Sequence, residues 1–222
     1  MAARLKQAVR AGSTLAYVSV ALATSMAAVA AGESTASVGG SGESGGRPVY
    51  LTVGEPTRAP IGWVDFCITY KAECATRPLE PLDVALTAKA WTDMVKVNDW
   101  VNESIRPMTD LEHWGVVERW NYPDDGFGDC EDYVLLKRRL LMQAGWPREA
   151  LLITVVRDRK GDGHAVLTVK TDRGEFILDN QESQVLPWAK TGYRFVKRQS
   201  QSDPNLWVSL GEPLAPATVS SR

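Results

Sequence analysis

The sequence predicts an α+β fold, in which two helices precede a run of antiparallel strands. Apolar residues recur every three to four positions in residues 83–105 and again in residues 129–144, which is the spacing of one buried helix face. Three β-branched or alternating runs follow, at residues 151–156, 165–171 and 176–178. Because the helices and the strands are segregated along the chain, the pattern indicates an α+β domain.

The first 31 residues have the composition of a secretory signal peptide. Three basic residues come first, and an uncharged apolar stretch follows that ends in Ala28-Val29-Ala30. We expect cleavage near Ala30 or Ala31, and the alternative is an uncleaved membrane anchor. Cleavage lowers the net charge from −2 to −5, because the segment holds three basic and no acidic residues. The mature chain is then expected in the periplasm or outside the cell, without stable membrane insertion, since no later apolar run could span a bilayer.

The composition is that of a folded protein with no affinity for nucleic acid. The chain has 222 residues, of which 44% are hydrophobic and 23% are charged, and this suits one medium-sized domain. A protein that displaces counterions from nucleic-acid phosphates needs a basic face, and the mature chain has no cluster of Lys and Arg. We therefore exclude nucleic acid as a partner.

The folded domain is expected at residues 48–212. Residues 32–47 are rich in Gly, Ser, Ala and Glu and lack apolar periodicity, which indicates a flexible linker. Proline and glycine interrupt the apolar and aromatic residues between positions 49 and 74, so we expect an irregular stretch with short strands there rather than a helix. The tail at residues 213–222 is expected to fray.

The first helix is expected over Asp83–Ile105 and ends before Pro107. Its apolar face consists of Leu86, Ala90, Met94, Val97 and Val101. The second helix begins at Asp129, and Gly145 is placed as its C-cap. Its apolar face consists of Tyr133, Leu136, Leu140 and Ala144. A short additional strand is expected from Tyr193 to Val196, after the three strands named above.

The three cysteines divide into a pair and a single residue. Cys67 and Cys74 are seven positions apart in a loop-like stretch, and an oxidising compartment would let them close a small disulfide ring. Cys130 is then unpaired. A free thiol in such a compartment is a liability unless it is buried and inert or has a use, so its surroundings are of interest.

Cys130 falls at the first turn of the second predicted helix, where free N–H groups and the helix dipole favour a thiolate over a thiol. Asp129 can cap this helix, and Gly128 lets the chain turn without a side chain that blocks access to the sulfur. The carboxylates beside the cysteine act the other way, because negative charge disfavours a second anion. A cationic partner is therefore needed.

His164 is the better of the two histidines for that role. It follows Asp162-Gly163 at the start of the predicted strand 165–171, where the edge of a strand can present an imidazole to the end of a helix. His113 lies in a Leu-Glu-His-Trp stretch with no obvious partner. We therefore take His164 as the base.

The residue that orients His164 is either Asp179 or Asn180, which follow the next strand. An even number of residues in the turn at 172–174 places Asp179 diagonally opposite His164, on the same face, because side chains alternate along a strand. An odd number places Asn180 there instead. Either side chain could accept the ring N–H and hold the imidazole.

Each of these residues also has an ordinary structural explanation. A lone cysteine is more often a small buried apolar residue, Asp129 could simply cap a helix, and Asp179 could simply form a turn. The chain nevertheless combines a cysteine at a helix start, a histidine at a strand start and an acid at a strand end, with the other two cysteines paired. This combination favours catalysis.

Three motifs give the chain a resemblance to a known family. Residues 128–133 are Gly-Asp-Cys-Glu-Asp-Tyr, residues 163–167 are Gly-His-Ala-Val-Leu, and residues 178–180 are Leu-Asp-Asn. In this order they resemble the bacterial transglutaminase-like cysteine peptidases, a group that includes the LapG-type proteases. The resemblance implies a papain-like or transglutaminase-like core, with the helix of the nucleophile packed on an antiparallel sheet. It also implies a catalytic triad, which consists of Cys130, His164 and Asp179.

The resemblance further implies a calcium site at the acidic residues that flank the cysteine. In LapG-type members such residues bind calcium, and here they would be Asp129 and Glu131, with Asp132 as a further candidate. Oxygen ligands suit calcium, and the ion would neutralise charges that oppose a thiolate. The alternative is that these acids only cap the helix and face solvent.

We expect a thiol-dependent hydrolase, namely a cysteine peptidase that acts on a protein or peptide substrate. The backbone N–H of Cys130 would hold the oxyanion together with a second donor, for which the indole of Trp120 is a candidate. One alternative is a transglutaminase or amidase that acts on cell-envelope peptides, with an amine attacking the acyl-enzyme. The other is a noncatalytic binding module, which the intact Cys, His and Asp disfavour. No motif identifies the substrate or a regulatory partner.

Overall fold

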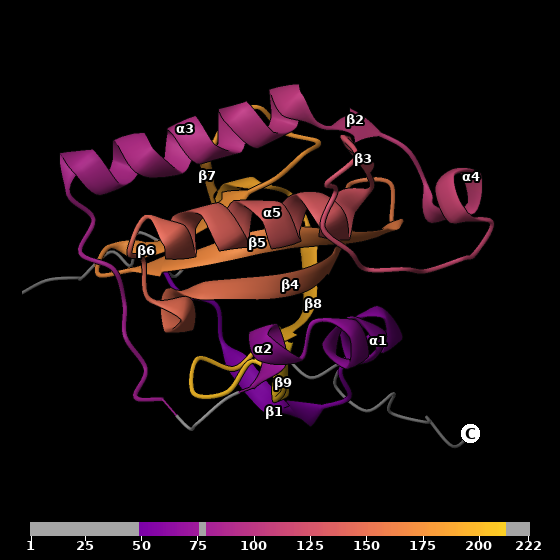
Figure 1. Cartoon of the computed structure of the whole chain (residues 1–222). Coiled ribbons are helices and arrows are strands. Elements are labelled where there is room, and N and C mark those ends of the chain that lie inside the picture. The colour runs from indigo at the N-terminus through magenta and orange to yellow at the C-terminus, as the bar shows by residue number, and fades with distance from the viewer. Residues whose placement is uncertain (1–48, 76–78, 212–222) are drawn as a thin grey trace, which may run out of the picture. The chain divides into compact units, whose positions relative to one another are not determined.

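The computed structural model describes residues 49–75 and 79–211 (Figure 1). The predicted signal peptide at 1–31, the linker at 32–47 and the tail at 213–222 lie outside the described residues, so the domain limits of 48–212 stay a prediction. In the part of the chain that is described, no helix combines the length and the apolar character needed to cross a bilayer.

Apart from β1 and the two-residue strands β2 and β3, the described strands follow the helices along the chain. The helices are α1 Ile61–Thr69, α2 Lys71–Cys74, α3 Ala88–Ser104, α4 Asp110–Trp114 and α5 Cys130–Gln143. The strands are β1 Val53–Thr57, β2 Arg106–Pro107, β3 Phe127–Gly128, β4 Leu151–Arg157, β5 Gly163–Thr171, β6 Gly174–Leu178, β7 Leu186–Pro187, β8 Arg194–Gln199 and β9 Trp207–Leu210.

One antiparallel sheet of seven strands carries the site. Its order within the described residues is β1-β9-β8-β4-β5-β6-β7, and every neighbouring pair is antiparallel. Strands β2 and β3 form a separate parallel pair just before α5. The mixture of helices with an antiparallel sheet confirms the predicted fold class, with the helix of Cys130 packed on the sheet.

Helix α5 is enclosed between the sheet and α3 (Figure 1). The face predicted from periodicity, represented by Tyr133 and Leu136, packs against Val101 and Ile105 at the end of α3. The opposite face packs on the sheet in the main core. It contributes Val134, Leu135 and Leu141, which contact a cluster that includes Ile153, Leu167 and Val169. Because both faces are apolar, α5 is buried along most of its length, which fixes the position of its first residue, Cys130.

Helix α3 begins later than the periodicity predicts. Its first residue is Ala88 rather than Asp83, because the Thr87 side chain caps it by accepting a hydrogen bond from the Ala90 N–H at 3.1 Å. The preceding residues join the sheet instead, where the Val84 N–H donates to the Lys170 carbonyl at 3.0 Å. Apolar spacing alone did not distinguish this extended segment from a helical turn.

The prediction of an irregular stretch with short strands at residues 49–74 is right for β1 but wrong for the rest, because α1 and α2 form there. Gly62 does not break α1. Its missing Cβ lets the helix backbone approach the Trp120 ring, since a Cβ would lie 2.2 Å from Trp120 Cδ1. Trp63 and Phe66 are buried on the inner face of α1. A disulfide joins Cys67 of α1 to Cys74 of α2, as the sequence predicts.

Candidate active site

Cys130 is the first residue of α5, is partly buried and is not in a disulfide. Its thiol donates a hydrogen bond to Glu131 Oε2 at 3.0 Å. Burial is the main cause that raises the pKa of the thiol well above its ordinary value, and the negative charge of Glu131 raises the pKa further. Burial and the charge of Glu131 thus favour the thiol over the thiolate, although the sulfur lies at a helix N-terminus.

The two residues before Cys130 have other tasks than those expected. Asp129 occupies the N-cap position, but its side chain makes no capping bond, and its Oδ2 accepts from the Asp110 N–H at 3.3 Å. At Gly128, an added Cβ would lie 2.7 Å from Asp132 Cβ, so the glycine makes room for Asp132 rather than for access to the sulfur. Asp132 is fully buried, and its Oδ1 accepts from the Asn121 N–H at 2.9 Å.

His164 lies near the start of β5, as predicted, and is buried. Its Nε2 is 2.8 Å from Asp179 Oδ1, which leaves Nδ1 as the nitrogen for other partners. The Gln181 side-chain nitrogen is 3.4 Å from that Nδ1. Burial tends to raise the pKa of Asp179, but the hydrogen bonds from His164, Tyr193 and the Gln181 N–H together hold it below its ordinary value.

The turn between β5 and β6 explains why Asp179 and not Asn180 reaches the imidazole. Thr171 pairs with Gly174, so the turn contains two residues, an even number. Leu167 pairs with Leu178, and Asp179 therefore follows at the position opposite Val166. Asn180 instead lines the cavity beside His164.

Two cavities meet at Cys130, Gly163 and His164, which line both of them. One, of about 400 Å³, is otherwise lined by Pro107, Met108, Thr109, Glu112, Asp129, Asn180 and Gln181. The other, of about 520 Å³, is otherwise lined by Pro60, Ile61, Val117, Glu118, Trp120, Glu131, Val155, Ala165 and Lys197. Cys130 and His164 thus line the same two cavities, and Asp179 contacts the imidazole at Nε2.

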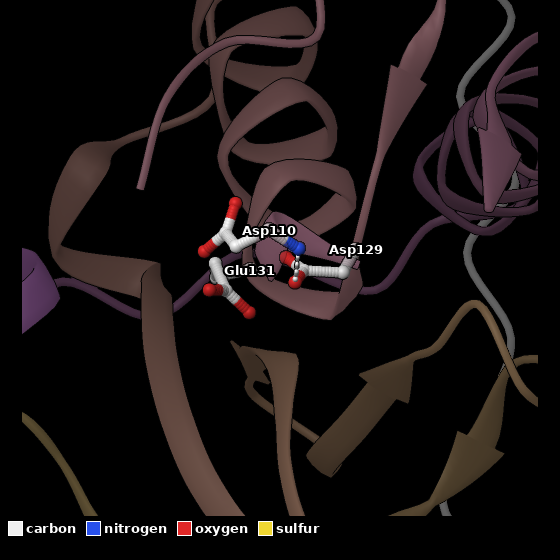
Figure 2. A group of neighbouring side chains, drawn as sticks. All are labelled: Asp110, Asp129 and Glu131. Atoms are coloured by element: carbon white, nitrogen blue, oxygen red, sulfur yellow. Dashed lines mark hydrogen bonds between the residues drawn. The ribbon is translucent and has the colours of Figure 1, made fainter. Parts of the chain in front are cut away.

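Asp110, Asp129 and Glu131 come together (Figure 2), and the last two flank Cys130 in the sequence. One carboxylate oxygen from each residue lies within 4.8 Å of the others, and Asp129 Oδ1 is buried without a hydrogen-bond partner among the described residues. Burial, and then the charge of Asp129, raise the pKa of Glu131 to about 9. Burial, and then the charge of Asp110, raise the pKa of Asp129. A set of buried oxygen donors with excess negative charge fits a divalent cation such as calcium.

Asp110 is the member of this group that sequence reasoning missed. It lies nineteen positions before Asp129, on the short helix α4, and no ligand spacing connects the two. The one local signal is the capping box of Thr109 and Glu112, which marks the start of α4. A capping box predicts where a helix starts, but not that α4 starts beside α5. The further candidate Asp132 lies instead against the Asn121 N–H.

His113 and Trp120 are the other residues that the sequence offers for catalysis, and both are engaged in other contacts. His113 contacts Asp125 Oδ2 at 2.8 Å, stacks on Trp114, and lines neither of the two cavities at Cys130. The Trp120 indole N–H donates to Glu118 Oε1 at 2.6 Å. The indole proton is therefore not available to a substrate oxyanion in this arrangement, although Trp120 lines the larger cavity.

Comparison with known proteins identifies the family of the chain. Similar solved structures are those of LapG from Legionella pneumophila. The calcium-bound form is 27% identical, with a TM-score of 0.46 over 55% of this chain and 72% of that chain. The EGTA-treated form is 27% identical, with a TM-score of 0.45 over 55% and 70%. No curated protein matches the chain. Residues 53–214 match the model of the bacterial transglutaminase-like cysteine proteinases. The chain therefore belongs to this family and is a cysteine peptidase.

Proposed function

We propose that the chain is an exported, thiol-dependent peptidase that hydrolyses a protein or peptide substrate with Cys130, His164 and Asp179. The observation that carries this proposal is the buried contact of 2.8 Å between His164 and Asp179, in the cleft that the imidazole lines together with the thiol. The Cys67–Cys74 disulfide supports export, because disulfides persist in oxidising compartments.

Each group has one task in the reaction. His164 Nδ1 accepts the thiol proton as Cys130 Sγ attacks the scissile carbonyl, and the same nitrogen then gives the proton to the leaving amine. Asp179 holds the ring through Nε2 and stabilises the imidazolium that forms. The Cys130 N–H, which lies at the start of α5, donates to the oxyanion. Water then cleaves the thioester and restores the thiol.

Asp110, Asp129 and Glu131 are proposed to bind calcium. Burying carboxylates that repel one another is energetically unfavourable without a cation. The penalty is greatest at Asp129 Oδ1, which has no hydrogen-bond partner among the described residues. Bound calcium would supply positive charge close to the nucleophile. Glu131 would then be a weaker acceptor for the thiol proton, which would make the proton easier for His164 to take.

The hydrolase assignment is tested by comparing the wild type with Cys130→Ala on a mixture of denatured proteins. Mass spectrometry should find new peptide termini with the wild type and none with the variant. A primary amine is added in a parallel sample. Amine incorporated in place of new termini would identify an acyl transferase instead. Cleavage by Cys130→Ala at the wild-type rate would reject Cys130 as the nucleophile.

The calcium site is tested by titration calorimetry and by melting curves, with Asp110→Asn as the variant. We expect calcium to raise the Tm of the wild type, because a ligand that binds only the folded state stabilises it. The variant should bind more weakly and show a smaller rise. Asp65→Asn, an exposed aspartate of α1 outside the group, is the control and should behave like the wild type. Equal melting of the wild type with calcium and with chelator would remove calcium from the proposal.

A further inference from the structure

The two cavities that meet at Cys130 and His164 differ in chemistry. The smaller cavity is lined by Thr109, Glu112 and Asn180 as well as by the apolar Pro107 and Met108, so its wall is mixed, with an acidic part. The larger cavity has a mostly apolar wall, whose members are Pro60, Ile61, Val117, Trp120, Val155 and Ala165. A peptide that crosses the cleft at the reacting sulfur therefore meets a different surface on each side.

Two side chains of the apolar wall are unusually exposed. Ile61 is 64% exposed and Val117 is 88% exposed. Single exposed apolar side chains are common on proteins. These two come from α1 and from the loop after α4, and they converge on one cavity that also contains the nucleophile and the base. An apolar surface that gathers at a reactive centre is typical of a ligand-binding site.

The wall that carries Ile61 is held in place by its surroundings. The backbone at Gly62 approaches the Trp120 ring too closely for any larger residue. Trp63 Nε1 donates to Asn205 Oδ1 at 3.3 Å, and the disulfide fastens the far end of α1 through Cys67. This wall of the cavity is therefore preformed, and a substrate does not have to order it on binding.

We propose, on the basis of the peptidase function above, that this cavity binds a bulky apolar side chain of the substrate close to the scissile bond, and that Ile61 and Val117 determine this specificity. A cavity of about 520 Å³ is large enough for a Leu, Ile, Met or Phe side chain. The wall of the smaller cavity is mixed and carries Glu112, so it suits such a side chain less well. The preference is therefore expected on one side of the scissile bond only.

The test is a cleavage profile with matched variants of the full chain. The wild type digests a peptide mixture in the presence of calcium, and mass spectrometry records the residues around each cleaved bond. We expect bulky apolar residues to be enriched at one fixed position. For such a peptide, Ile61→Ser and Val117→Ser should each lower kcat/KM about tenfold, mainly through KM, because one side chain in an apolar pocket contributes roughly that discrimination.

Ile68→Ser is the matched control. Ile68 lies on the same helix and is 66% exposed, almost as Ile61 is, but it lines neither cavity. It should leave kcat/KM unchanged. For a peptide with Ala at the selected position, Ile61→Ser and Val117→Ser should have little effect, which separates lost specificity from misfolding.

A binding measurement keeps the outcome independent of catalysis. In the Cys130→Ala background, a peptide with Leu at the selected position should bind more tightly than its Ala counterpart, and Ile61→Ser should remove the difference. Equal affinity of both peptides, or wild-type kcat/KM in both variants, would overturn the specificity proposal while leaving the peptidase intact. Cleavage that persists in Cys130→Ala would instead overturn the peptidase proposal.

Discussion

Asp179 is held at both of its carboxylate oxygens. Oδ1 contacts His164 Nε2 and accepts from the Gln181 N–H, and Oδ2 accepts from the Tyr193 hydroxyl at 2.6 Å. The Tyr193 ring also meets the imidazole edge to face, with 5.9 Å between the ring centroids. Asn102 of α3 donates to the Asp179 carbonyl at 2.8 Å. The carboxylate therefore has little freedom to rotate away from the histidine.

Tyr193→Phe should therefore lower activity without removing any reacting group. Loss of the hydroxyl removes a donor that lowers the pKa of Asp179, so this pKa rises and the carboxylate becomes protonated at higher pH. The acid limb of the kcat/KM profile should move to higher pH, and kcat should fall about tenfold, as for a lost hydrogen bond to a charged group. Tyr50→Phe, which loses a bond to the Thr171 carbonyl, is the control. An unchanged acid limb would contradict this prediction.

At the residue scale, the sequence was sufficient to place Cys130 at a helix start and His164 near a strand start, since both positions follow from local patterns. It left Asp179 and Asn180 open, because the number of residues in the turn depends on which residues pair, and Asp172-Arg173-Gly174 is compatible with either count. The pairing of Thr171 with Gly174 decides it. Asp110 could not be predicted, since its place beside Asp129 depends on how α4 packs.

At the element scale, α1 contains a glycine that the packing of the helix requires. Pro60 and Gly62 predict a break in helical structure, yet Pro60 only precedes the first turn and Gly62 faces Trp120. The spacing of Trp63 and Phe66 is that of a buried helix face, but two such positions in a stretch rich in breakers are a weak signal. The tertiary contact with Trp120 decides the local structure.

Gly62→Ala should destabilise the protein, although alanine favours a helix over glycine in general. The new methyl group would overlap the Trp120 ring, and overpacking of this kind costs about 1–3 kcal/mol. Urea denaturation monitored by circular dichroism should show a lower midpoint. Asp65→Ala, at an exposed position of the same helix, should shift the midpoint little. A stabilised Gly62→Ala variant would mean that α1 does not pack on Trp120 as described.

At the scale of the whole molecule, the burial of α5 between the sheet and α3 has a cost. Lys137 of α5 is fully buried, and its Nζ has no hydrogen-bond partner within the described residues. Burial lowers the pKa of Lys137 to about 7, against the opposing effect of the charges of Asp179 and Asp99. The ammonium lies over the Tyr133 ring, 5.9 Å from its centroid. A helix that anchors the nucleophile thus also carries an energetically unfavourable group.

Lys137→Met should raise the Tm, and more so at about pH 6 than at about pH 9. Above pH 7 the folded protein releases the Lys137 proton, while the unfolded chain keeps it up to its ordinary pKa of 10.5. The lysine therefore makes stability rise with pH in this window, and below it the buried charge is most costly. Lys96→Met, at an exposed position of α3, should show no such dependence. An equal effect of Lys137→Met at both pH values would contradict the inference that burial lowers the pKa of Lys137 in the folded protein.

The disulfide between Cys67 and Cys74 closes a ring across only seven positions. A ring of this size lowers the conformational entropy of the unfolded chain by roughly half as much as a ring of a hundred residues. Its main effect is therefore to hold the local geometry of α1 and α2. Through Cys67 it fastens the end of α1 that lies opposite Ile61. A mild reductant should therefore lower the cleavage specificity more than it lowers the stability of the fold. The reduced enzyme would still hydrolyse peptides, but with a weaker preference at the selected position.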